Sequence, residues 1–252
     1  MIIDGHCHAG RGDRLTAPWN TAAPLGAYLR RAREAGIQRT VVFPPFAGDY
    51  AVANADLARV VARHPGRLVG YAAVHPRRDA GRVNELVGRA VREWGFRGVK
   101  VHRLDAPATR EVCAAAAAFG VPLLYDVAGQ PELLEQAAPA YPQLTFLVPH
   151  LGSFADDWRA HQRLIDQLCR LPNVLADTSG VRRFDYLVQA VRRAGPGRLV
   201  FGSDGPWLHP ALELEKIRLL RLEPAAEAQI LGGNLRRLLR LGAPVADVRA
   251  MA

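Results

Sequence analysis

Two histidines near the amino terminus, His6 and His8, are separated by a single residue in the segment Met1–His8. Side chains of an extended strand alternate between its two faces, so Asp4, His6 and His8 are expected on one face and Cys7 on the other. Neutral imidazole is a common ligand for zinc and suits other transition metals. The spacing predicts half of a metal site, although His-x-His also occurs as two solvated histidines at the end of a strand.

The apolar pattern around these histidines predicts strands that alternate with helices along the whole chain. The expected strands span residues 2–8, 39–43, 68–74, 96–102, 121–126, 144–150, 173–178 and 198–203. They are nearly continuous apolar runs, as in parallel strands that are covered on both faces. No Pro/Gly/Ser-rich linker divides the chain, so we expect one (β/α)8 TIM barrel over residues 1–252 with an extra C-terminal helix at about 225–241. The alternative is a doubly wound open sheet, but residues 10–12 do not resemble its phosphate-binding loop.

Polar residues stand at the ends of most of these strands, where a barrel gathers its chemistry. They are His6, His8, His75, Lys100, His102, Asp126, His150, Asp177 and Asp204. Taken singly, His75 is expected to be a loop histidine and Asp177 a turn or helix-capping residue. His102 could contact a substrate or make a buried hydrogen bond. Lys100 is the only lysine on an expected strand, and we expect it to bind substrate or contact the site.

Charge and composition restrict the partners of the chain. It has 252 residues, 49% of them hydrophobic, and a formal net charge of +9. Only two of its 33 basic residues are lysines, and the arginines occur as scattered pairs, not as one basic stripe with aromatic residues. We therefore expect a small-molecule substrate, attracted by the basic surface if it is anionic, and no nucleic acid. The possibility of a homo-oligomer stays open.

Cysteine usage and hydropathy indicate the compartment. The three cysteines are far apart and form no Cys-x-x-Cys pair, which favours a reducing cytoplasm. The alanine-rich uncharged run of residues 112–125 contains a glycine and a proline and is shorter than the roughly 20 residues of a membrane helix. No signal peptide is expected, because the first strand begins at residue 2.

Several motifs, in order along nearly the whole chain, resemble those of the amidohydrolase superfamily, specifically its amidohydrolase-2 group. The matching segments are Asp4–His8, Gly98–His102, Gly120–Leu124, Val148–Gly152, Asn173–Gly180, Phe201–Pro206 and Ile230–Asn234. The resemblance implies a (β/α)8 barrel with one divalent metal, usually zinc. It implies that His6 and His8 are metal ligands, that Asp204 contacts both the metal and the attacking water, and that His150 faces the substrate.

One position departs from the family pattern. Where the family usually has a metal-binding histidine at the end of the fifth strand, this sequence has Asp126, which shares a strand face with Leu124. In one interpretation Asp126 is an oxygen ligand, which makes manganese or iron alternatives to zinc. In the other, the metal is weakly bound or absent.

These residues predict a metal-dependent hydrolase that acts on a lactone, cyclic amide or ester. A divalent metal can lower the pKa of bound water from 15.7 to about 7. Asp204 would take the proton of the attacking water, and His150 would steady the oxyanion or orient the water. Lys100 and His102 would bind the substrate. The alternatives are a non-oxidative decarboxylase of a small carboxylic acid, which the resemblance makes less favoured because family decarboxylases are usually longer, and a metal-poor, non-catalytic binding protein.

Overall fold

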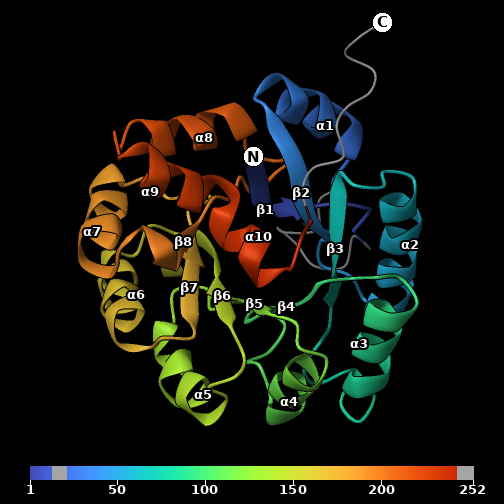
Figure 1. The fold of residues 1–252 in the computed structure, drawn as a ribbon. Helices are drawn as coiled ribbons and strands as arrows, with labels where there is room; N and C mark the ends of the chain where they lie inside the picture. Colours follow the sequence, from blue (N-terminus) through green and yellow to red (C-terminus); the bar gives the residue numbers. More distant parts are fainter. Residues whose placement is uncertain (13–21, 243–252) are drawn as a thin grey trace, which may run out of the picture.

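Eight parallel strands form one sheet in sequence order, with the helices arranged around it (Figure 1). The computed structural model describes residues 1–12 and 22–242. The strands are β1 (Ile2–His8), β2 (Ile37–Phe43), β3 (Leu68–Ala73), β4 (Gly98–His102), β5 (Leu123–Asp126), β6 (Phe146–Val148), β7 (Val174–Asp177) and β8 (Leu199–Val200). The chain after β8 returns to β1, where Cys7 bridges Gly205 in parallel and Gly5 N–H donates to Phe201 O at 2.8 Å. The predicted (β/α)8 barrel is confirmed.

A helix follows each strand and covers the outside of the barrel. The helices are α1 (Leu25–Glu34), α2 (Tyr50–Ala62), α3 (Val83–Arg92), α4 (Arg110–Ala118), α5 (Leu134–Ala140), α6 (Trp158–Arg170), α7 (Phe184–Ala194) and α8 (Pro210–Arg218). Side chains of Asp49, Thr109 and Asp157 cap α2, α4 and α6 by accepting hydrogen bonds from their first backbone N–H groups. These caps fix where the loops before α2, α4 and α6 end, and the last of these loops carries His150. In the described part of the chain, no helix combines the length and the apolar character needed to span a bilayer.

The expected C-terminal helix is present but interrupted. It divides into α9 (Pro224–Ala228), a single π-turn labelled η4 (Gln229–Gly233) and α10 (Asn234–Leu238). The interruption occurs where the chain passes closest to β1, since a Cβ atom on Gly232 would lie 2.4 Å from the carbonyl oxygen of Met1. Leu235 of α10 then packs on Ile3 and Val200 inside the barrel. The interrupted helix therefore closes the end of the barrel at which the strands begin.

The strand alternation predicted for β1 is wrong at Asp4. The pairing with β2 shifts between Asp4 and Cys7, which marks a β-bulge in β1. Asp4 therefore does not share a face with His6 and His8. Its carboxylate accepts a hydrogen bond at 2.5 Å from the Tyr28 hydroxyl of α1, between the barrel and its outer helix layer. The bulge leaves both histidines directed into the barrel.

Candidate metal and substrate site

His6, His8 and Asp204 meet where β1 and β8 end. Asp204 Oδ1 lies 3.4 Å from His6 Nε2 and 3.5 Å from His8 Nε2. One ligand atom from each residue lies within 4.8 Å of the other two, and all three residues are buried. Ligands that bind one zinc ion at about 2.0–2.2 Å are at most about 4.4 Å apart. The structure thus brings three of the predicted metal-binding residues to a spacing close to that of a single ion.

The orientation of the His6 ring leaves one nitrogen without a protein partner. His6 Nδ1 lies 2.8 Å from Asp177 Oδ2, and because a carboxylate can only accept, Nδ1 carries the ring proton. His6 Nε2 is buried and has no hydrogen-bond partner. An unsatisfied buried acceptor is costly, and metal-binding histidines usually donate their other N–H to a carboxylate in this way. This donor set fits a divalent metal ion.

The protonation of the same group also suits a metal. Burial lowers the pKa of His8 to about 4, although the neighbouring Asp204 opposes the shift. Burial raises the pKa of Asp204, but the interactions with His8, His6 and His150 outweigh it, so the pKa lies below its usual value. Near neutral pH the group therefore presents imidazole lone pairs and a carboxylate.

Asp177, expected from the sequence to be a turn or capping residue, does more than end β7. Its Oδ1 accepts hydrogen bonds from Ser179 N at 3.0 Å and Ser179 Oγ at 2.6 Å, which is the expected turn. The same oxygen accepts from the backbone N–H of His150 at 3.0 Å, and Oδ2 holds His6. Burial raises the pKa of Asp177, but the interactions with His6, including the hydrogen bond, outweigh it and hold the pKa at about 2. One carboxylate thus positions two residues of the predicted site.

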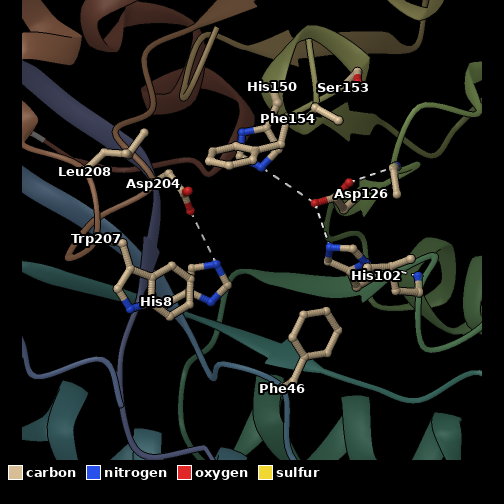
Figure 2. A pocket seen from close by; sticks show the side chains of 13 residues that line it. His8, Phe46, His102, Asp126, His150, Ser153, Phe154, Asp204, Trp207 and Leu208 are labelled. Atoms are coloured by element: carbon tan, nitrogen blue, oxygen red, sulfur yellow. Dashed lines mark hydrogen bonds and ion pairs between the residues drawn. The ribbon is translucent and has the colours of Figure 1, made fainter. Parts of the chain in front are cut away.

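His150 follows β6 in a short 3-10 turn, η2 (Pro149–Gly152), with a left-handed backbone at φ 57° and ψ 27°. Its Nδ1 lies 2.9 Å from the carbonyl oxygen of Ser179, which can only accept, so Nδ1 carries the proton. The remaining Nε2 points into a cavity and lies 3.6 Å from Asp126 Oδ2 (Figure 2). The ring centroids of His150 and His6 are 4.8 Å apart. His150 therefore lies beside the three residues of the candidate metal site, and its Nε2 faces the cavity.

Asp126 ends β5 and engages residues of β4. Its Oδ2 lies 3.0 Å from His102 Nε2 (Figure 2). Because Leu104 N–H donates to His102 Nδ1 at 3.1 Å, the neutral ring carries its proton on Nε2 and donates to Asp126. Burial raises the pKa of Asp126, but the electrostatic interactions with His102 and Lys100 outweigh it and hold the pKa well below its usual value. Asp126 does not belong to the group of mutually close ligand atoms, and its role as a metal ligand stays a prediction.

Lys100 approaches Asp126 from β4 but does not line the main cavity. Its Nζ lies 3.8 Å from Asp126 Oδ2 and 5.0 Å from the centroid of the Phe43 ring. The atom is buried without a hydrogen-bond partner, and burial lowers its pKa against the opposing charge of Asp126. Lys100 lines a separate small hollow together with Phe46 and Tyr50. Lys100 therefore contacts the site through Asp126, and its contact with substrate stays a prediction, whereas His102 lines the main cavity.

The main cavity has a volume of about 480 Å³ and opens above the polar residues (Figure 2). Its lining comprises His8, Phe46, His102, Leu104, Asp126, Ala128, His150, Ser153, Phe154, Ala155, Asp204, Trp207 and Leu208. Residues of the loops 103–107 and 153–157 contribute to this lining. No periodic pattern in the sequence marks Phe46, Trp207 or Leu208, which are apolar residues in loops.

Three aromatic side chains of this lining each pack on one histidine. The ring centroids are 4.3 Å apart for Trp207 and His8, 4.7 Å for Phe46 and His102, and 5.0 Å for Phe154 and His150. The polar groups are thus surrounded by apolar walls, which is typical of a small-molecule site. Low local polarity also strengthens the electrostatic interactions of groups inside the cavity.

Comparison with known proteins agrees with the fold. Residues 3–241 match the profile of the amidohydrolase family, Amidohydro_2, so the chain belongs to this family. The resemblance recognised in the sequence motifs is thereby confirmed. No curated protein sequence matches the chain.

Solved structures with the same fold include both hydrolases and decarboxylases. An amidohydrolase from Burkholderia multivorans with bound HEPES is 20% identical, with a TM-score of 0.78 over 96% of this chain and 100% of that one. A Pseudomonas putida protein designated a 2-pyrone-4,6-dicarboxylic acid hydrolase is 21% identical, with a TM-score of 0.74 over 95% and 97%. A dihydroxybenzoic acid decarboxylase from Polaromonas with bound manganese is 19% identical, with a TM-score of 0.69 over 95% and 97%. At these identities the likeness concerns the fold alone.

Proposed function

We propose that the chain hydrolyses a carbonyl substrate, a lactone, cyclic amide or ester, with a divalent metal ion held by His6, His8 and Asp204. The observation that supports this most directly is the buried, unpartnered His6 Nε2 beside the Asp204 carboxylate, 3.4 Å away. Two imidazoles and a carboxylate are a usual donor set for zinc, and manganese or iron are the alternatives. When bound, the ion supplies an acidified water and polarises the carbonyl oxygen of the substrate.

The side chains around this group have distinct tasks in the proposed reaction. The Asp204 carboxylate accepts a proton from the attacking water and returns it to the leaving group. Since His150 Nδ1–H is committed to Ser179 O, the neutral ring offers only the Nε2 lone pair to the cavity. His150 therefore accepts a hydrogen bond and orients the water. Of its two predicted roles, donation to an oxyanion would first need a proton on Nε2.

The remaining polar residues hold the substrate and its surroundings. His102 lines the cavity and donates from Nε2 to Asp126, so its ring is fixed where a substrate would contact it. The Lys100 ammonium lies next to the Asp126 carboxylate and, by lowering the pKa of Asp126, helps to keep that carboxylate ionised. Asp126 would have to move to join the other three ligands as the fourth.

Metal analysis together with a substrate panel tests this proposal. We expect about one divalent ion per chain by elemental analysis, and hydrolysis of at least one member of a lactone, lactam and ester panel. Asp204→Asn should lower kcat by about a hundredfold or more while the chain stays folded. Asp185→Asn is the matched control, because Asp185 pairs with Arg183 on the surface at 3.0 Å. Stoichiometric metal with full activity in Asp204→Asn would refute the assignment.

One observation also favours a second reaction, non-oxidative decarboxylation. The aromatic walls over the polar floor would strip water from the carboxylate of a bound aromatic acid, which favours loss of carbon dioxide. Release of carbon dioxide from aromatic or enoic acids, without hydrolysis of the panel above, would identify this reaction. A chain that binds no stoichiometric metal and keeps its stability in chelator would instead fit the non-catalytic binding protein.

The expected compartment also stays a proposal. All three cysteines are free, and Cys7 and Cys113 are buried. Free thiols support the cytoplasmic location expected from the sequence, because an oxidising compartment favours disulfides. Localisation of a tagged chain by fractionation would test it.

A further inference from the structure

Two hydrogen-bond acceptors face each other across the floor of the cavity. His150 Nε2 and Asp126 Oδ2 are 3.6 Å apart, and both residues line the cavity. The His150 proton is on Nδ1, as shown by its hydrogen bond to the Ser179 carbonyl. The carboxylate has no proton to offer, so in the neutral state of His150 no hydrogen lies between the two atoms. A ligand O–H or N–H placed there donates its hydrogen to one of the two acceptors or shares it between them.

The other contacts of Asp126 are already committed to the protein. Its Oδ1 accepts from Ala128 N at 2.9 Å, and Oδ2 accepts from His102 Nε2 at 3.0 Å. These bonds hold the carboxylate with its Oδ2 facing His150 Nε2 at 3.6 Å (Figure 2). An ionised carboxylate accepts hydrogen bonds only, and a hydrogen bond to a charged group is among the stronger ones. A donor placed there is therefore bound selectively over an acceptor of the same size.

The aromatic side chains above Asp126 and His150 suit a flat, apolar ligand. Phe46, Phe154 and Trp207 come from three different loops and face the same cavity of about 480 Å³. Trp207 is 39% exposed and Leu104 51% exposed, although both are large and apolar. A single planar ring would cover these surfaces and leave its substituents near the polar floor.

We propose that Asp126 and His150 form a paired acceptor that selects a substrate with an O–H or N–H donor on a planar, otherwise apolar ring. Asp126 is then a specificity-determining residue that contacts substrate, which differs from the metal-ligand role predicted from the sequence. The inference rests on the proposed function, because the reacting carbonyl must reach His6, His8 and Asp204 in the same cavity. The donor could also be the attacking water, and the experiment separates these two sources.

Matched ketone probes test the pair without any reaction. Hydroxyacetophenones and fluoroacetophenones, substituted at the 2, 3 or 4 position, have a carbonyl that is not hydrolysed and differ in one donor group of similar size. Kd values are measured by calorimetry on the metal-loaded chain. We expect at least one hydroxyl compound to bind about 10- to 100-fold more tightly than its fluoro counterpart. In Asp126→Asn this ratio should fall to within about threefold, with the metal content unchanged.

Asp105→Asn is the matched control. Asp105 accepts a hydrogen bond from Tyr50 at 2.6 Å and does not line the main cavity, so the ratio should persist in this variant. Loss of metal from Asp126→Asn would overturn the inference, because it would show that Asp126 is a ligand. Failure of every acetophenone to bind would overturn the planar-ring class.

The remaining outcomes separate this inference from the proposed function. Equal binding of hydroxyl and fluoro compounds, with a lower kcat in Asp126→Asn on a hydrolysed substrate, would assign the donor to water and overturn the inference alone. A hydroxyl preference that disappears in Asp126→Asn, in a chain that hydrolyses nothing in the panel, would support the inference and refute the proposed hydrolysis.

Discussion

Asp177 should determine which nitrogen of His6 is free to bind a metal. In the wild-type chain Asp177 Oδ2 accepts from His6 Nδ1–H at 2.8 Å, which leaves a lone pair on Nε2. In Asp177→Asn the carbonyl oxygen can replace Oδ1, which accepts from His150 N and from the N–H and hydroxyl of Ser179. The amide NH2 then faces His6 Nδ1 and can only donate. The ring proton must move to Nε2, the tautomer that cannot bind a metal through that atom.

The expected loss of metal affinity follows from the one hydrogen bond, between residue 177 and His6, whose direction is reversed in Asp177→Asn. A hydrogen bond to a charged partner contributes about 1.5–3 kcal/mol, which corresponds to roughly 10- to 100-fold in affinity. Removal of the second residue that orients a metal-binding histidine usually has a similar effect. We therefore expect Asp177→Asn to weaken metal binding by about 10- to 100-fold. The three contacts to Oδ1 are kept, so the variant should remain folded.

Competition with a fluorescent chelator measures the metal affinity, and ¹⁵N spectra of the histidine rings identify the tautomer. The expected spectra show His6 protonated on Nδ1 in the wild-type chain and on Nε2 in Asp177→Asn, both without metal. Asp185→Asn, on the exposed first turn of α7, makes the same chemical change where no histidine depends on it. Equal metal affinity in Asp177→Asn and the wild-type chain, or an unchanged His6 tautomer, would refute the reasoning.

Three further predictions concern stability and substrate binding. Chelation should lower the Tm by roughly 5–10 °C, since a metal at a hundred times its Kd stabilises by about 2.7 kcal/mol, and readdition of zinc or manganese should restore it. Burial raises the pKa of Glu213 above 4.5 despite Lys216, so the stabilising effect of its protonated form is lost as pH rises through the raised pKa. In urea unfolding, the wild-type chain should therefore lose stability relative to Glu213→Gln as pH rises from about 4.5, and a relative gain would contradict this. Trp207→Ala removes the ring packed on His8 and should raise KM by about tenfold with unchanged metal content, and an unchanged KM would exclude Trp207 from the substrate site.

The barrel was predictable because its signals are local. Each strand is a short apolar run, and glycines or prolines separate most runs from the helices that follow. The errors fall where a contact distant in sequence overrides the local pattern. The bulge in β1 places Asp4 against Tyr28, and Gly232 breaks the last helix where it passes Met1. Neither contact can be read from the alternation or helical periodicity of one segment.

The candidate site was predictable only in part for the same reason. The ends of the strands identify which residues approach the carboxyl edge of the barrel, and the structure brings His6, His8 and Asp204 together there. The strand ends do not show which side chains form hydrogen bonds with one another. Asp177 reads as an ordinary turn residue until its contact with His6, 171 positions away, is known. The aromatic wall residues are single apolar side chains in loops, and no periodic pattern distinguishes them from other exposed apolar residues.

Backbone groups and a carboxylate determine what His6, His102 and His150 offer to the site. Asp177 and the Ser179 carbonyl hold the protons of His6 and His150 on Nδ1, so both rings present acceptors from Nε2. The Leu104 N–H has the opposite effect on His102, which then donates from Nε2. Chemically identical side chains are thus differentiated by the single partner behind each ring. A substrate or metal must match this fixed pattern of acceptors and donor, and substitution of a partner should change specificity even though no cavity-lining atom is altered.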